Sequence, residues 1–219
     1  MKDLENICLS VEHDFDGKYQ SVAPEIVQTS SFQFQNFAHY VHVNTDHEFA
    51  YTYTRGDNPT LEILEKKIAH LEGAECGRSF ASGMGAISGT ILSLVKKGDH
   101  IIIVNTVYGS SVKLIQQLQS IGMTPRAFNK MIYFESPSSQ RFEMLDLEMI
   151  ANVAKEKNIY TVIDNTWATP LLQNPLKYGI DVVIHSCSKY IGGHSDIVGG
   201  IVLCRQEIMK YIDDFAHIF

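Results

Sequence analysis

The chain has 219 residues and a formal net charge of −7 at pH 7, and its 45% hydrophobic and 20% charged residues are typical of a globular protein that buries a sizeable core. The acidic balance, without long Lys/Arg clusters, argues against a nucleic-acid partner. No apolar run reaches the length of about 18 residues that a membrane span needs, and the acidic N-terminus does not resemble a secretory signal. Four widely spaced cysteines without CxxC spacing predict free thiols and a cytoplasmic protein; they are Cys8, Cys76, Cys187 and Cys204.

Residues 1–50 show no sustained hydrophobic period, and we predict an irregular, extended N-terminal arm. The stretch SSFQFQNF alternates and could form one short strand. His39, His42 and His47 lie close together in the sequence, but their spacing matches no standard metal-ligand pattern, so we expect a loop without metal. Residues 51–219 form the predicted main domain.

From residue 58 the sequence alternates between helical and strand patterns. Asn58 and Pro59 begin a helix, apolar residues then recur at helical spacing, and Gly73 ends it. The alternation continues to the C-terminus and predicts an α/β domain with a mostly parallel sheet, in which ligands bind at the carboxyl ends of the strands. The expected helices span about 86–97, 110–121 and 146–157, and the expected strands follow at a short run before Ser82 and at 100–105, 130–136, 159–165, 180–186 and 196–204.

One stretch does not fit this alternation. MTPRAF (123–128) could be a strand, yet only Asn129 and Lys130 separate it from the strand KMIYFES. A parallel crossover needs a dozen residues or more. The stretch is therefore a loop, or one arm of a hairpin, or the remnant of a lost crossover.

The most distinctive local feature is SCSKYIGGH, in which Lys189 follows a buried strand. A lysine in low-dielectric surroundings shifts toward the neutral amine, which is the form that makes a Schiff base with an aldehyde. The hydroxyls of Ser186 and Ser188, on either side of Cys187, could bind an anion such as phosphate. The alternative is a solvated loop lysine between two surface serines.

Asp164 ends the apolar strand TVIDN, where a carboxylate is unfavourable unless it has a partner. Pairing with a protonated ring nitrogen is one use for it, because pyridoxal phosphate chemistry needs such an acid together with a Schiff-base lysine. The alternative is a helix cap for the following segment NTWATP.

Ser82-Gly83-Met84-Gly85 lies between a strand and a helix, where glycines and free helix N–H groups suit an anion. A dinucleotide fingerprint is not complete, because its third glycine falls on Ser88 and the next strand lacks a terminal acid. We therefore predict a phosphate site, with a simple tight turn as the alternative. Arg55, just before a helix, is either a phosphate ligand or a surface arginine.

Together these segments resemble the Cys/Met-metabolism family of pyridoxal phosphate enzymes, the transsulfuration group. DVVIHSCSKYIGGHSDIVGG is similar to the family's lysine signature, and YTRGDNPT, ASGMGAI, VYG, ESP and DNTWATP occur in the family's order, from about residue 8 to the C-terminus. The resemblance implies a fold type I α/β large domain, pyridoxal phosphate as cofactor, and β- or γ-elimination or γ-replacement on cystathionine, related sulfur amino acids or homoserine esters.

The resemblance also implies a role for each matching residue. Lys189 carries the Schiff base (the internal aldimine) and later moves the proton at Cα, while Asp164 keeps the pyridine nitrogen protonated. Tyr108 stacks on the ring and assists the departing group. The phosphate ligands would be the backbone amides of Gly83 and Met84 and the hydroxyls of Ser186 and Ser188.

Tyr53 and Arg55 would reach the phosphate of a neighbouring subunit, which implies a homo-oligomer, a dimer or tetramer. Two departures accompany the match. Ser139-Gln140 stands where the family has Asn-Pro, and the sequence ends at Phe219 where the family continues into a C-terminal domain that supplies an arginine for the substrate carboxylate. An incomplete large domain is therefore expected. The alternative function is a remnant or inactive partner that binds pyridoxal phosphate without turnover, and a nucleotide-binding α/β protein is a third.

Overall fold

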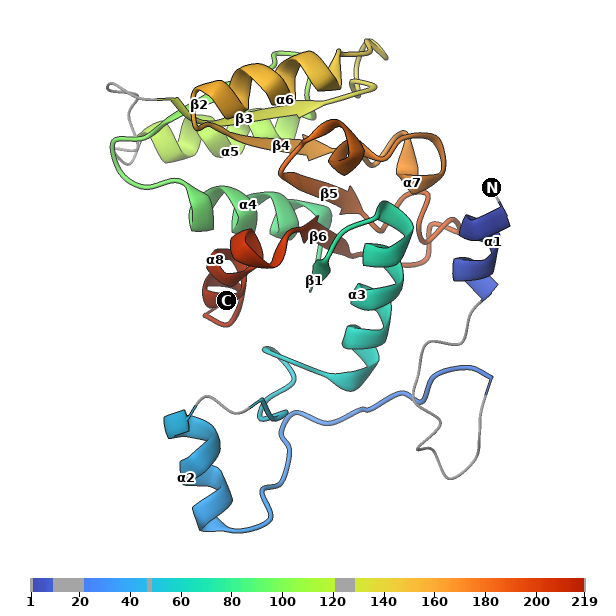
Figure 1. Cartoon of the computed structure of the whole chain (residues 1–219), viewed down its shortest axis with the longest axis vertical. Helices are drawn as coiled ribbons and strands as arrows, with labels where there is room; N and C mark the ends of the chain where they lie inside the picture. Colours follow the sequence, from blue (N-terminus) through green and yellow to red (C-terminus); the bar gives the residue numbers. More distant parts are fainter. Residues whose placement is uncertain (1, 10–21, 47–48, 121–128, 219) are drawn as a thin grey trace.

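The computed structural model describes residues 2–9, 22–46, 49–120 and 129–218. Their centre is one six-stranded sheet with the strand order β1-β6-β5-β4-β3-β2 (Figure 1). Neighbouring strands from β2 to β5 pair in parallel, and only β6 runs against its neighbours β5 and β1. The prediction of a mostly parallel α/β sheet is confirmed. The strands are β1 (Cys76–Phe80), β2 (His100–Ile103), β3 (Asn129–Glu135), β4 (Tyr160–Asp164), β5 (Val182–Ser186) and β6 (Gly200–Cys204).

Helices cover both faces of the sheet and bury two apolar clusters against it (Figure 1). Alternate strand residues supply the two clusters, as strand geometry requires. Val162 and Ile184 pack toward α4, α5 and α8, whereas Ile163 and Val183 pack toward α3 and α6. The helices are α3 (Pro59–Glu72), α4 (Gly83–Leu94), α5 (Gly109–Ser120), α6 (Leu147–Glu156), the short α7 (Thr169–Leu172), a 3-10 turn (Pro175–Tyr178) and α8 (Gln206–Ala216).

The predicted first helix is confirmed at both ends. The Asn58 side chain accepts a hydrogen bond from the Thr60 N–H at 2.9 Å, and Gly73 ends α3 in the left-handed conformation with φ of 75°. The next helix, α4, begins earlier than predicted, at Gly83, because the Ser82 hydroxyl caps it by accepting from the Gly85 N–H.

The prediction of a strand over residues 196–204 is correct only for the second half of this range. Its second half forms β6 and its first half is loop. Gly200 lets β6 begin against the loop that precedes α4, since a Cβ there would lie 2.4 Å from the Ser82 carbonyl oxygen. The problematic stretch 123–128 lies outside the described residues, and α5 makes the crossover between the parallel strands β2 and β3.

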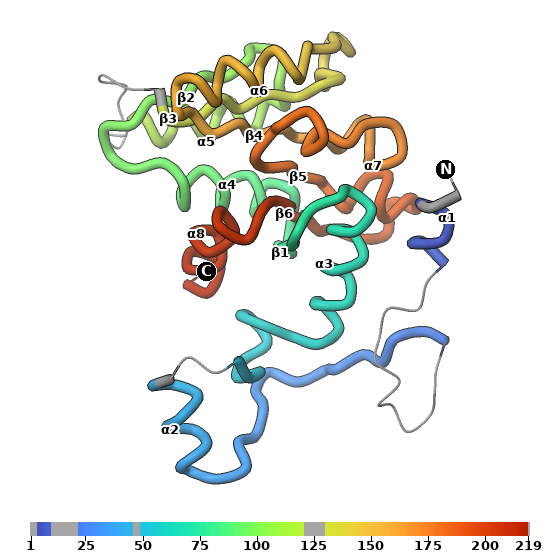
Figure 2. The backbone as a smooth tube through the Cα atoms, viewed as in Figure 1, coloured from blue at the N-terminus to red at the C-terminus, as the bar shows by residue number. Residues whose placement is uncertain are grey.

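The expectation of an irregular arm was wrong at two places, because α1 (Lys2–Leu9) and α2 (Phe37–Asp46) are helical. The alternating stretch forms only one bridge, from Ser31 to Tyr53. Residues 22–36 are otherwise extended, and α2 stands apart from the sheet layers (Figure 2). His39 and His42 lie in α2 rather than in a loop, and no cluster of metal-ligating side chains exists among the described residues. None of the described helices is long and apolar enough to cross a membrane.

Replacement of Gly200 tests the contact between β6 and the loop before α4. In Gly200→Ala the new methyl meets the main chain of Ser82 and Gly83, which cannot move like a flexible side chain, so we expect a loss of about 2 kcal/mol in the free energy of unfolding. Gly109→Ala is the matched control, because its Cβ meets nothing within 4 Å. Urea denaturation of both variants gives the comparison, and equal stability would contradict the packing described here.

Candidate functional site

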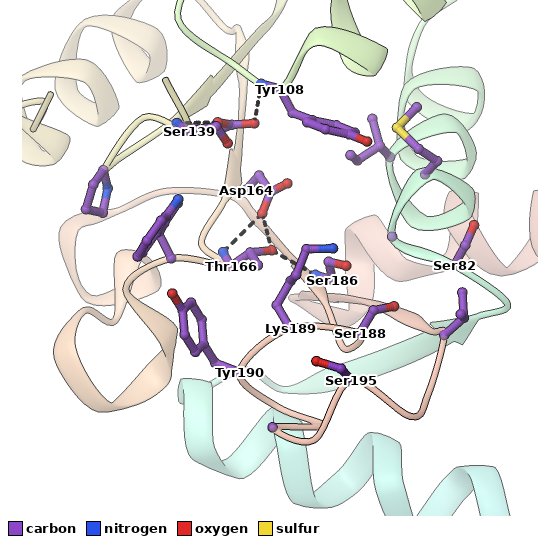
Figure 3. A pocket seen from close by; sticks show the side chains of 18 residues that line it. Ser82, Tyr108, Ser139, Asp164, Thr166, Ser186, Ser188, Lys189, Tyr190 and Ser195 are labelled. Atoms are coloured by element: carbon purple, nitrogen blue, oxygen red, sulfur yellow. Dashed lines mark hydrogen bonds between the residues drawn. The ribbon is translucent and has the colours of Figure 1, made fainter. Parts of the chain in front are cut away.

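A cavity of about 550 Å³ opens at the carboxyl ends of β3, β4 and β5, beside the start of α4 (Figure 3). This is the edge of the sheet at which the sequence predicts a ligand. Seven of the nine predicted site residues line it, although they come from segments up to about a hundred residues apart. They are Gly83, Met84, Tyr108, Asp164, Ser186, Ser188 and Lys189.

Tyr53 and Arg55 do not reach this cavity within the single chain. The Arg55 guanidinium lies 5.6 Å from the centre of the Tyr53 ring, and its Nη1 donates to the Ile218 carbonyl at 2.7 Å, near the end of α8. Both residues line a separate hollow with residues 26–30 of the arm. The loop that carries them is tied to the body by Arg78 on β1, which pairs with Asp57 and with Asp213 of α8.

The end of β4 is joined to the end of β5 through one hydroxyl. Asp164 Oδ1 accepts hydrogen bonds from the Thr166 N–H at 3.0 Å and from the Thr166 hydroxyl. The same hydroxyl oxygen accepts from the Ser186 N–H at 2.8 Å (Figure 3). Both bonds to Asp164 engage Oδ1, so Oδ2 remains available to a donor in the cavity.

The Asp164 carboxylate lines the cavity and is partly buried. Burial raises its pKa above the usual range, while the bonds from Thr166 and the charges of His185 and Lys189 act in the opposite direction. A partly buried carboxylate of this kind gains most from a cationic partner in the cavity. The helix-cap alternative was wrong, because α7 begins after Ala168 without a side-chain cap, and Asp164 instead holds the turn at Thr166.

Lys189 is placed by a tight turn directly after β5. Its N–H donates to the Ser186 carbonyl at 3.1 Å, and its own carbonyl accepts from Gly193 at 2.7 Å. Among the described residues that line the cavity, Lys189 is the only basic one, and its side chain points into it (Figure 3). Cys187 lies in the buried apolar cluster instead of the cavity lining, and burial raises the pKa of its thiol to about 11.

The start of α4 and the end of β5 meet closely enough to form an anion cradle. A Cβ on Gly83 would lie 2.9 Å from the Ser186 Cβ and hydroxyl, so a larger residue than glycine would fill this space. Ser188 accepts from the Gly199 N–H at 3.0 Å, which orients its hydroxyl. The helix N-terminus adds its own N–H groups and the positive end of its dipole.

Glu135, at the end of β3, is a site residue that the sequence analysis did not identify. It is buried, and its two oxygens accept from the Tyr108 N–H at 2.7 Å and the Ser139 N–H at 3.0 Å, so it fixes both loops at the cavity wall. Burial raises the pKa of Glu135. Its position at the end of an apolar strand is the signal that identified Asp164 and would have found Glu135 too. Thr166 was also missed, and only its two-residue distance from Asp164 hinted at it.

These features fit pyridoxal phosphate. The cavity has the size of a typical cofactor site. The Lys189 amine, in the turn after β5, and the Asp164 carboxylate, at the end of β4, can face the aldehyde and the ring nitrogen of one small aromatic group, and the Gly83–Ser186 cradle can receive its phosphate. Lys189 and Asp164 share one cavity, so the arrangement that would have excluded this cofactor, with the two residues on opposite sides of the sheet, is absent.

A three-layer α/β fold with a lysine and a partly buried acid at adjacent strand ends is typical of a pyridoxal phosphate enzyme of fold type I, and comparison with known proteins gives the same class. Residues 5–217 match the model of the family described as Cys/Met metabolism PLP-dependent enzyme. The chain belongs to this family.

Relatives within the family carry several activities. The chain is 36% identical to the L-methionine gamma-lyase of Fusobacterium nucleatum over 211 residues, which are 89% of this chain and 53% of that protein. It is 43% identical to the cystathionine beta-lyase of Coxiella burnetii over 186 residues, 75% of this chain and 48% of that protein. The chain thus spans about half the length of these curated relatives.

Two solved structures are similar throughout the chain. Cystathionine gamma synthase from Xanthomonas oryzae, in complex with aminoacrylate and cysteine, has a TM-score of 0.89 and 32% identity, covering 98% of this chain and 58% of that one. A putative O-acetylhomoserine (thiol)-lyase from Campylobacter jejuni has a TM-score of 0.87 and 31% identity, covering 95% and 55%, and carries N'-pyridoxyl-lysine-5'-monophosphate.

Replacement of Asp164 tests whether its charge destabilises the cofactor-free fold. Because burial raises the pKa of Asp164, the ionised form destabilises the fold above that pKa. We expect cofactor-free Asp164→Asn to be more stable than wild type by on the order of 1 kcal/mol at mildly alkaline pH, and the difference to vanish under acid conditions where Asp164 is protonated. Urea denaturation at both pH values measures this. Asp214→Asn, on the exposed side of α8, is the control; a stability loss in Asp164→Asn at alkaline pH would contradict the expectation.

Proposed function

We propose that this chain binds pyridoxal phosphate covalently through Lys189 and acts on sulfur amino acids, by elimination or replacement at the β or γ carbon. The observation that carries the proposal is the placement of Lys189 and Asp164 in one cavity at the ends of neighbouring strands. The activities named for the relatives, methionine gamma-lyase and cystathionine beta-lyase, support the substrate class.

Different residues of the cavity would bind different parts of the cofactor. Asp164 would keep the ring nitrogen protonated, and the Gly83 and Met84 amides with the Ser186 and Ser188 hydroxyls would bind the phosphate. When bound, pyridoxal phosphate supplies an aldehyde for condensation with amines and a ring that withdraws electrons from the substrate Cα.

Two further residues of the cavity act at the substrate. Lys189 Nζ takes and returns the proton at Cα, because it is the basic group of this cavity. The Tyr108 ring lines the cavity, with its backbone fixed by Glu135, and its hydroxyl would assist the departing group.

Replacement of Lys189 tests the covalent link. We expect Lys189→Ala to lose the visible absorbance that wild type gains on addition of pyridoxal phosphate, because no other basic side chain of the described cavity can replace its amine. Borohydride reduction and peptide mapping should place the cofactor on Lys189 in wild type. Lys210→Ala, on the exposed side of α8, should behave as wild type. An unchanged spectrum in Lys189→Ala would refute the proposal.

The proposal includes a homo-oligomer in which each cavity is completed by its neighbour. Tyr53 and Arg55 lie outside their own chain's cavity, yet they share a short loop beside an arm that stands away from the body. Large apolar side chains on this arm are more than two-thirds exposed, which favours contact with another chain; they are Val22, Ile26, Phe37 and Phe49.

Subunit mixing tests this arrangement. Lys189→Ala and Arg55→Ala chains should each bind pyridoxal phosphate poorly, the first for lack of the amine and the second for lack of a phosphate ligand. In a mixed dimer one cavity has its own Lys189 and receives the partner's Arg55, so unfolding and refolding the two variants together should restore binding to about a quarter of the wild-type sites, if pairing is random. No recovery, with dimers present in sedimentation, would refute the shared site.

Turnover is tested with the same purified chain. Release of a keto acid from cystathionine or methionine, lost in Lys189→Ala, would support the enzyme. Binding of pyridoxal phosphate without any turnover would support the alternative, a catalytically incomplete remnant or partner.

A further inference from the structure

Glu72 is the last residue of α3, and its side chain is fully buried. This location is unfavourable for a carboxylate in two ways. Burial removes its hydration, and the carbonyl groups at a helix C-terminus repel negative charge. A group placed against both effects needs specific partners, and such violations of local preference are typical of functional sites.

The partners of Glu72 come from the two strands that build the cavity. Oε2 lies 2.7 Å from Nε2 of His185, which is equally buried on β5. Both carboxylate oxygens also accept from the Asn165 Nδ2, at 3.4 and 3.5 Å. Asn165 in turn bonds reciprocally with Gln173, whose amide reaches the Ser136 carbonyl at the end of β3 at 2.7 Å.

The sequence positions of these partners connect the network to the candidate site. Asn165 directly follows Asp164, and His185 directly precedes Ser186. Ile184, the register partner of Asp164, packs on the α4 face, so strand alternation turns His185 to the α3 face. Glu72 therefore joins the two strand ends beneath the sheet, while Thr166 joins them on the cavity side.

We propose that Glu72 and His185 form a buried pair of positioning residues for the cofactor, which keeps Asp164 and Ser186 at the separation that the ring and the phosphate of one ligand require. This inference rests on the proposed binding of pyridoxal phosphate. The structure also shows an unsatisfied atom in the pair: His185 Nδ1 is buried without a hydrogen-bond partner among the described residues. Retention of such an atom in the core speaks against a purely stabilising role.

The pair also has an electrostatic effect on the cavity. The titratable groups that act on Asp164 are His185 from below, Lys189 from the cavity, and Glu135 and Tyr133 from β3. His185 favours the ionised form of Asp164, which in turn would favour a protonated ring nitrogen, and the bond from Glu72 holds the His185 ring in place. Neutralising Glu72 weakens this support without touching any cavity residue.

The experiment compares the affinity of the 219-residue chain for pyridoxal phosphate in wild type and in Glu72→Gln, measured by absorbance titration. We expect Kd to rise on the order of tenfold, as for other partners that orient a ligand-binding group. The pH midpoint of the bound cofactor's absorbance change should also move upward, because a less positive ring favours protonation of the nitrogen joined to Lys189. Glu72→Gln/His185→Gln should not exceed the larger single effect, since the two residues act as one unit.

Ile68→Ala is the matched control, because Ile68 is buried one turn earlier on the same helix and has no part in the network. It should lower the melting temperature but leave Kd and the pH midpoint unchanged. If Glu72→Gln does not fold, Gln173→Ala, at the partly exposed end of the network, should raise Kd in the same direction. Unchanged binding in the variants, or an equal effect in Ile68→Ala, would overturn the inference alone. Failure of wild type to bind pyridoxal phosphate would overturn the proposed function as well.

Discussion

The hydroxyl of Thr166 is the contact on which the candidate site depends. It donates to Asp164 and accepts from the Ser186 N–H, so one oxygen fixes the ends of β4 and β5 to each other. Parallel strands already place their carboxyl ends at one edge, but pairing between β4 and β5 stops at Asp164 and Ile184. The Asn165 N–H still donates to the Ile184 carbonyl at 2.9 Å, and beyond this bond side chains hold the two ends together. The side-chain bridge continues the constraint to the residues that the cofactor would contact.

The same edge accumulates negative charge in a poorly hydrated environment. Asp164 and Glu135 end neighbouring strands, and burial raises the pKa of each. Glu72 adds a third carboxylate, which is fully buried, below the sheet. Hydrogen bonds from Thr166, Tyr108 and Ser139 offset part of this penalty but use the acids as anchors for loops. The poor hydration of these carboxylates therefore destabilises the cofactor-free fold, and a cationic ring would offset this effect. Ligand sites commonly reduce stability for this reason.

The sequence predicts those parts of the structure that depend on neighbours in the chain. The caps of α3, the buried strands and the chemistry of Lys189 and Asp164 follow from local pattern and residue type. The network of Glu72 could not be found this way, because its contacts join residues 93 and 113 positions apart. The start of α4 and of β6 depends on a close approach between Ser82 and Gly200, which is again visible only in three dimensions. The short helix α2 has too weak an apolar period to distinguish it from an extended arm.

Under the proposed function, the charges of the cavity give a reason why phosphate binding would need a second copy of the chain. Lys189 is the only basic side chain among the described residues that line it, and covalent attachment would commit its amine to the aldehyde. Within one chain, the phosphate would then meet neutral donors only, the hydroxyls and N–H groups of the cradle. A phosphate dianion in a half-enclosed cavity is better balanced by a guanidinium. Arg55 meanwhile contacts the Tyr53 ring and donates to the Ile218 carbonyl just after α8, and neither contact supplies the negative charge that a phosphate would. The separation of the arginine from its own cavity is thus what a site shared between two copies of the chain requires.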